Sequence, residues 1–146
     1  MSYKQRTVLY STPEVLSDDI KLSNAVRQIL SLQPDAASKL IGKTTSTAYR
    51  RIHEHLTAVF DRATETLTQP EPKNINTVIL GLTKGLILVE YQLSRGQISE
   101  ELGSKLREVL NTLLNSLNEK DSARKFERAR TLLDALAVLV YRQRGG

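Results

Sequence analysis

The sequence predicts an all-α fold: a compact bundle of about five helices around a buried central helix, with no sheet. Apolar residues recur at steps of three and four along several stretches, which is the periodicity of an amphipathic helix, and no stretch alternates as a strand does. We expect residues 1–15 to be a loose N-terminal segment and residues 16–146 to form a single helical domain. The proline-containing loop at residues 68–76 is too short to indicate a domain boundary.

The first helix is predicted after Leu16, with Ser17 or Asp18 as its cap and an end near Pro34. Its buried positions are expected to be apolar residues at roughly helical spacing: Leu16, Ile20, Val26, Ile29 and Leu30. A short helical turn should follow over Asp35–Ile41 and stop at Gly42.

A longer helix is predicted to begin at Thr44 or Thr45, either of which can cap it, and to end near Leu67. Its apolar positions form a clean amphipathic stripe: Tyr49, Ile52, Leu56, Val59, Phe60, Ala63 and Leu67.

The stretch Thr77–Leu93 is apolar on nearly every side and contains only two charged residues, Lys84 and Glu90. A helix of this kind is normally buried or in a membrane, and 17 residues with two charges are too few for a span. We therefore expect it to be the central helix. Gly81 and Gly85 lie on one of its faces, which favours close approach by a neighbouring helix.

Two further helices are predicted, separated by a turn at residues 118–122. Ser99 should cap the first, whose buried positions are expected to be Ile98, Leu102, Leu106, Val109, Leu110, Leu113 and Leu117. The second should bury Phe126, Ala129, Leu133, Leu136, Ala137 and Val140. Its opposite side is expected to gather Arg124, Arg128, Thr131, Ala135 and Arg142.

The distribution of charge indicates a polyanionic partner. The chain has a formal net charge of +5 and a pI of about 9.6. Residues 120–146 hold seven basic and three acidic residues, whereas residues 1–119 hold 14 basic and 13 acidic residues. Nearly all of the excess therefore belongs to the last helix and tail. Cysteine is absent and the first residues contain no apolar secretory signal, so we expect a cytoplasmic protein that does not bind a membrane.

No pattern indicates catalysis, a metal site or a cofactor. His53 and His55 are two residues apart on a helix and therefore point to different sides, unlike an i, i+4 metal-binding pair. Acidic residues are scattered without pairing, and no nucleophile elbow or triad is recognisable. We do not expect an enzyme.

Basic residues on the last helix are the first candidates for function, because cations at helical spacing can follow a phosphate backbone. An ordinary solvated face would have the same composition. Lys43, Arg50 and Arg51 form a second candidate group near the start of a helix, where unpaired N–H groups also favour phosphate.

A helix-turn-helix is the alternative for the same region, because the run from Ser38 to Arg50 resembles one. Residues 44–51 would then read DNA, mainly through Ser46, Thr47, Tyr49 and Arg50. Against this alternative, the motif would bury Ala48 and Arg51, whereas the apolar stripe here contains Tyr49 and Ile52.

A second resemblance covers roughly Leu40–Gly146 and rests on three short motifs. The first is Thr44-Thr45-Ser46 followed by Tyr49-Arg50, and the second is Tyr91 with Arg95. The third is Lys125-Phe126 followed by the run from Leu133 to Tyr141, in which Asp134 replaces a glutamate and two extra residues follow Ala137. In their order and spacing these motifs resemble the small helical, Csm-type subunit of type III CRISPR interference complexes.

This resemblance implies a non-catalytic subunit of a ribonucleoprotein effector complex. Such subunits stack in a row beside other subunits and contact guide RNA and target RNA without regard to sequence. Together with the basic residues noted above, it implies these candidate RNA contacts: Lys43, Arg50, Arg51, Arg95, Arg124, Lys125, Arg128 and Arg142.

Overall fold

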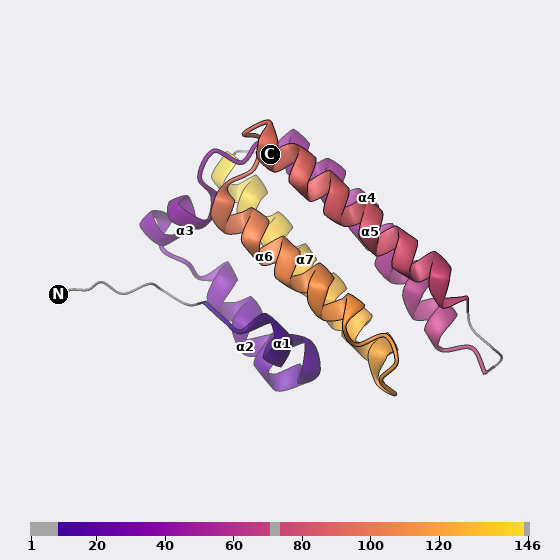
Figure 1. The fold of residues 1–146 in the computed structure, drawn as a ribbon. Helices are drawn as coiled ribbons and strands as arrows, with labels where there is room; N and C mark the ends of the chain where they lie inside the picture. Colours follow the sequence, from indigo (N-terminus) through magenta and orange to yellow (C-terminus); the bar gives the residue numbers. More distant parts are fainter. Residues whose placement is uncertain (1–8, 71–73, 145–146) are drawn as a thin grey trace.

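The computed structural model describes residues 9–70 and 74–144, which form seven α-helices and no strand (Figure 1). The helices are α1 (Thr12–Ser17), α2 (Asp19–Leu30), α3 (Pro34–Ile41), α4 (Ser46–Leu67), α5 (Ile75–Ser94), α6 (Glu100–Leu114) and α7 (Ser122–Arg144). The expected all-α class is confirmed. No helix in the described ranges is long and apolar enough to cross a membrane.

The N-terminal part differs from the expectation of a loose segment over residues 1–15. Residues 1–8 lie outside the described part, but α1 begins at Thr12, and Thr12 and Val15 are buried. Thr12 Oγ1 donates a hydrogen bond to Glu108 of α6 at 2.7 Å. The sequence does not reveal α1 because a helix of six residues is too short to show a period.

The predicted first helix corresponds to α2, whereas Leu16 belongs to the separate helix α1. One of the two expected caps is confirmed at Asp18. Its side chain accepts a hydrogen bond from the Lys21 N–H at 2.8 Å and caps α2. The break invalidates the spacing that linked Leu16 to Ile20: Leu16 is buried, whereas Ile20 is 72% exposed. Leu30 is also exposed, and Leu22 takes an inward position that the sequence did not indicate.

The predicted caps and buried faces of α4 and α6 are confirmed. Thr45 accepts a hydrogen bond from the Ala48 N–H at 3.1 Å, and Ser99 accepts one from the Leu102 N–H at 3.0 Å. All of the apolar residues expected on the inner faces of these helices are buried. Local capping chemistry and a 3.6-residue period were sufficient here.

The central helix is α7, not the predicted stretch Thr77–Leu93. Among the described elements, α7 packs against α1, α2, α3, α4 and α6, whereas α5 packs only against α4 and α6. Figure 1 shows α5 running beside α4 along one edge of the bundle. Leu80 and Ile87 on α5 are 53% and 63% exposed. The prediction was wrong because an apolar composition does not require burial on every side: α5 is packed on one side and exposes apolar residues on the other.

The two glycines of α5 do allow close approach, as the sequence predicted, and the neighbour is α4. A Cβ on Gly85 would lie 2.6 Å from Leu56 Cδ2, and one on Gly81 would lie 3.1 Å from Val59 Cγ1. Leu56 and Val59 are themselves buried, so the glycines let these side chains fill the interface.

Hydrogen bonds tie the α3–α4 loop to the α5–α6 loop at one end of the bundle. The Thr45 N–H donates to the Gln97 carbonyl at 2.9 Å, and the Ser99 N–H donates to Thr44 Oγ1 at 2.9 Å. Ser99 Oγ donates to the Leu40 carbonyl at 2.6 Å. The start of α4 and the end of α5 are thereby held together.

Candidate nucleic-acid interface

The predicted basic stripe of α7 does not face solvent as a row of unpaired charges. Arg124 and Arg128 both bind the carboxylate of Asp19 on α2, at 2.7 and 2.8 Å. Lys125 binds Glu119 at 2.6 Å, and only 10% of its side chain is exposed. Ala135, expected on the same solvated side, is buried. These three cations join α7 to its surroundings.

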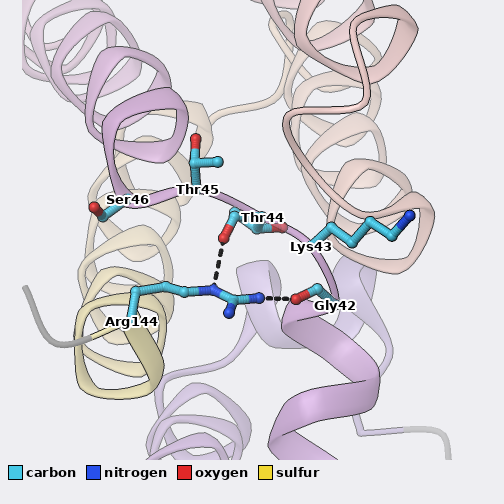
Figure 2. A pocket seen from close by; sticks show the side chains of 6 residues that line it. All are labelled: Gly42, Lys43, Thr44, Thr45, Ser46 and Arg144. Carbon is cyan, nitrogen blue, oxygen red and sulfur yellow. Dashed lines mark hydrogen bonds between the residues drawn. The ribbon is translucent and has the colours of Figure 1, made fainter.

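The two arginines near the end of α7 also bind the protein's own backbone. Arg142 Nη1 donates to the Leu30 carbonyl at 2.8 Å, which connects α7 to the end of α2. Arg144 Nε donates to the Thr44 carbonyl at 2.8 Å, and its Nη2 donates to the Gly42 carbonyl (Figure 2). Arg142 and Arg144 keep their positive charges, but part of each guanidinium is already hydrogen-bonded.

Four of the predicted contacts remain exposed and have no acid within salt-bridge distance in the part of the chain that the structure describes: Lys43, Arg50, Arg51 and Arg95. Lys43 lies in the α3–α4 loop, Arg50 and Arg51 lie in the early turns of α4, and Arg95 caps the C-terminus of α5. The hydrogen bond between Thr45 and Gln97 holds these elements together. We call this group of four cations the basic end.

Within the basic end, Arg50 and Arg51 point to different sides of α4. On a helical wheel, the side chains that lie between Arg50 and Arg51 are all exposed. The two arginines therefore border the outer surface of α4. Arg50 leans toward α7, since the neighbouring His53 binds Asp134 of α7 at 2.8 Å. Arg51 leans toward α5, because His55 reaches the Gly81 carbonyl there at 3.4 Å.

A shallow hollow lies at the start of α4, lined by Gly42, Lys43, Thr44, Thr45, Ser46 and Arg144 (Figure 2). Figure 2 shows that Arg144 reaches across to the loop, while the Lys43 side chain extends away from it. The positive end of the α4 dipole adds to the basic character of this region.

Tyr91 adds an aromatic surface next to the basic end. It is 52% exposed, and the Arg95 guanidinium lies 5.5 Å from its ring centroid. Arg95 Nη1 also donates to the Tyr91 hydroxyl at 3.1 Å. An exposed tyrosine beside an arginine offers a base both stacking and charge.

Two positively charged residues of the α4–α5 surface were missed by the sequence reasoning: Arg62 and Lys84. Both are exposed and lack an acidic partner in the described ranges. No sequence signal singles out either residue, because their shared surface arises only from the packing of α4 against α5.

Burial at the two diagnostic positions of the helix-turn-helix alternative is divided. Ala48 is buried, as the motif requires, but Arg51 is exposed, and Tyr49 and Ile52 of the amphipathic stripe are fully buried. The helix that would read DNA is 22 residues long and packs against both α5 and α7.

His53 and His55 do point to different sides of α4, as predicted. Within residues 9–70 and 74–144, no group of three His, Cys, Asp or Glu side chains is placed to hold a metal ion.

In comparisons with known proteins, no family model, curated protein or solved structure matches the chain.

Proposed function

We propose that the protein is a non-catalytic RNA-binding subunit that contacts the phosphates of guide and target RNA through its basic end, without reading bases. The observation that supports this most directly is the contrast between the two groups of cations. Those of α7 are used within the fold, whereas Lys43, Arg50, Arg51 and Arg95 are exposed together without acidic partners in the described chain. An unpaired group of this kind attracts a polyanion.

The kind of complex is proposed from the sequence resemblance to the small subunits of type III CRISPR effectors. Two of its three motifs, Thr44-Thr45-Ser46 with Arg50 and Tyr91 with Arg95, contribute residues to this end of the bundle. The third lies on α7, where Lys125 is paired with Glu119. The proposal therefore removes Arg124, Lys125 and Arg128 from the RNA contacts and gives them a structural role.

The decisive experiment compares two variants that lose equal charge from different surfaces. The site variant is Lys43→Ala/Arg50→Ala/Arg51→Ala, and the matched control is Lys21→Ala/Arg27→Ala/Lys120→Ala, whose residues are also exposed. Fluorescence anisotropy with a labelled 30-nucleotide RNA would give the affinity of each at several salt concentrations.

We expect the site variant to bind at least tenfold more weakly than the control. Each lost contact to single-stranded RNA should also reduce the slope of log K against log salt by about 0.7, so three contacts should reduce it by about 2. Equal losses in the two variants would show that only net charge matters. A strong preference for one RNA or DNA sequence would contradict recognition through phosphates alone.

A further inference from the structure

The outer side of α5 presents an apolar row that nothing in the described chain covers. Leu80, Ile87 and Tyr91 are 53%, 63% and 52% exposed, and Lys84 lies among them. Steps of four, three and four residues place these four side chains in one line along the helix. We call Leu80, Lys84, Ile87 and Tyr91 the outer row. Exposed large apolar side chains that line up on one side of a surface helix are a feature of interaction sites.

The burial pattern shows that the outer row is not left over from poor packing inside. The opposite side of α5 is closely packed: Val78, Leu82 and Val89 are buried, and a Cβ on Gly85 would lie 2.6 Å from Leu56 and 3.6 Å from Leu110. This side of α5 packs against both neighbouring helices, α4 and α6. The apolar side chains of the outer row are thus additional to those that the fold requires.

The two edges of the outer row differ in charge. Lys84 lies on the edge of the outer row that is nearer to α4. On α4, Arg62 lies on the same side of the helix as His55, which bonds to the Gly81 carbonyl of α5. Neither Lys84 nor Arg62 has an acidic partner among the residues described. On the α6 edge, Glu90 is neutralised by Arg107, whose Nη2 donates to it at 3.1 Å.

We infer that the outer row docks an amphipathic helix of a partner protein, which places apolar residues over Leu80, Ile87 and Tyr91 and acidic residues along the α4 edge. The difference in charge between the two edges is the reason for this choice of partner. Acidic residues of the partner on the α4 edge would pair with Lys84 and Arg62, which lack counter-charges in the described chain. Tyr91, which bonds to Arg95 of the basic end, is shared between this surface and the one proposed for RNA, whereas Leu80, Lys84 and Ile87 belong to the outer row alone.

A second copy of the chain fits this surface less well. If two α5 helices packed antiparallel about a two-fold axis, each edge would meet its own equivalent, and Lys84 and Arg62 of both copies would lie on the same side. Like charges brought together in this way oppose association. A partner with the opposite charge on that edge has no such penalty.

Two synthetic helical peptides of about 20 residues, acetylated and amidated, would test the inference. Both carry leucines at i, i+4, i+7 and i+11, and one has glutamates along a single edge where its twin has lysines. Binding of the labelled peptides to the full chain is measured by fluorescence anisotropy. We expect the glutamate peptide to bind at least tenfold more tightly than its twin, and to weaken as salt rises.

Variants of the chain then locate the binding surface. Leu80→Gln/Ile87→Gln changes exposed positions to residues that also favour a helix, and should weaken the glutamate peptide at least tenfold. Ile20→Gln, at a 72% exposed position on α2, is the matched control and should change nothing. Lys84→Glu should remove most of the preference for the glutamate peptide, because an acid then replaces one of the two cations on that edge and leaves only Arg62.

Equal binding of the twins, or no effect of Leu80→Gln/Ile87→Gln, would overturn the inference. So would a dimer in light scattering that Leu80→Gln/Ile87→Gln dissociates, since a second copy would then be the occupant. RNA affinity should be unchanged in Leu80→Gln/Ile87→Gln, so the docking surface and the RNA site can fail independently.

Discussion

The Arg128 guanidinium connects α7 to both N-terminal helices at one point. Its Nε donates to Asp19 of α2 at 2.8 Å, and its Nη1 donates to the Leu16 carbonyl of α1 at 2.9 Å. Only 12% of the Arg128 side chain is exposed. A residue that sequence reasoning assigns to RNA therefore helps to hold the bundle together.

Replacing Arg128 with alanine should destabilise the protein. The change leaves the Leu16 carbonyl without its donor and removes the packing of a largely buried aliphatic stem, which together cost about 1–3 kcal/mol. Urea denaturation followed by circular dichroism would measure the change. Arg50→Ala is the control and should alter stability by less than about 0.5 kcal/mol, because that side chain is exposed. Equal effects of the two substitutions would contradict a structural role for Arg128.

The Asp19 carboxylate should make stability dependent on pH at the acidic end. The hydrogen bond from Arg128 is the main cause that lowers the pKa of Asp19 below its usual value, with the charge of Arg124 adding to it. Because the folded pKa is the lower one, the stabilisation is complete above the unfolded pKa of about 3.9 and is lost as pH falls through the folded pKa. The stability difference between wild type and Asp19→Asn should thus be constant from pH 7 to about pH 5 and shrink below about pH 4. A difference that persists unchanged at pH 2 would exclude this ion pair as its cause.

Alanine at the two glycines of α5 should have unequal effects. At Gly85 the new methyl would lie 2.6 Å from the buried Leu56, and the resulting overpacking of about 1–3 kcal/mol should exceed the gain in helix propensity of about 1 kcal/mol. At Gly81 the nearest atom is 3.1 Å away, so the two terms should nearly cancel. Thermal melts would rank the variants. Adding Leu56→Val should reduce the extra cost of Gly85→Ala, and a double-mutant cycle without coupling would disprove the contact.

Gly42 and Gly96 both have positive φ, but alanine should be tolerated much better at Gly96. Gly42 has φ 52° and ψ −128°, and a Cβ there would lie 2.9 Å from the Ser99 Cβ. Gly96 has φ 70° and open space around it, so only the left-handed strain of about 1–2 kcal/mol applies. The free energies of unfolding should therefore fall more for Gly42→Ala than for Gly96→Ala. RNA affinity should fall as well in Gly42→Ala, because the loop bearing Lys43 must shift.

The buried hydroxyls of Tyr49 and Tyr10 offer a comparison of a paired and an unpaired polar group. Tyr49 donates to the Leu133 carbonyl at 3.0 Å, whereas the Tyr10 hydroxyl has no partner among the described residues. Burial raises the pKa of both phenols, so both stay protonated at neutral pH. We expect Tyr49→Phe to cost about 1 kcal/mol of stability and Tyr10→Phe to cost nothing or to stabilise slightly. The reverse order in chemical denaturation would contradict the hydrogen bond to Leu133.

The parts of the fold that were predicted correctly are those set by local sequence. Thr45 and Ser99 cap their helices because a short hydroxyl side chain reaches the next turn, and the buried stripes of α4 and α6 follow from a single period. Local sequence does not show which helix lies at the centre of the bundle. The α7 helix is central even though it holds six of the chain's arginines and lysines, because Arg128 and Arg130 extend their charged ends to Asp19 and Asp61 on neighbouring helices.

The candidate site was predicted in part for the same reason. The exposed positions of Lys43, Arg50 and Arg51 follow from the amphipathic pattern of α4 and the loop before it. The pairing of Arg124 with an acid 105 residues earlier in the chain has no signature in the spacing of residues. Counting charges along a helix shows where cations are, but it cannot show which of them already have a partner.

The edge position of α5 has a consequence for how the molecule opens. With only two neighbours, this helix buries less surface than α7 does, and releasing it should require less energy than unfolding the whole chain. Its backbone amides should then exchange with deuterium through a partial opening of the structure, whereas the amides of α7 should exchange only when the whole chain unfolds. Anything that binds along Leu80 and Ile87 would slow that exchange, so deuterium uptake in α5 would detect a partner without any label on it.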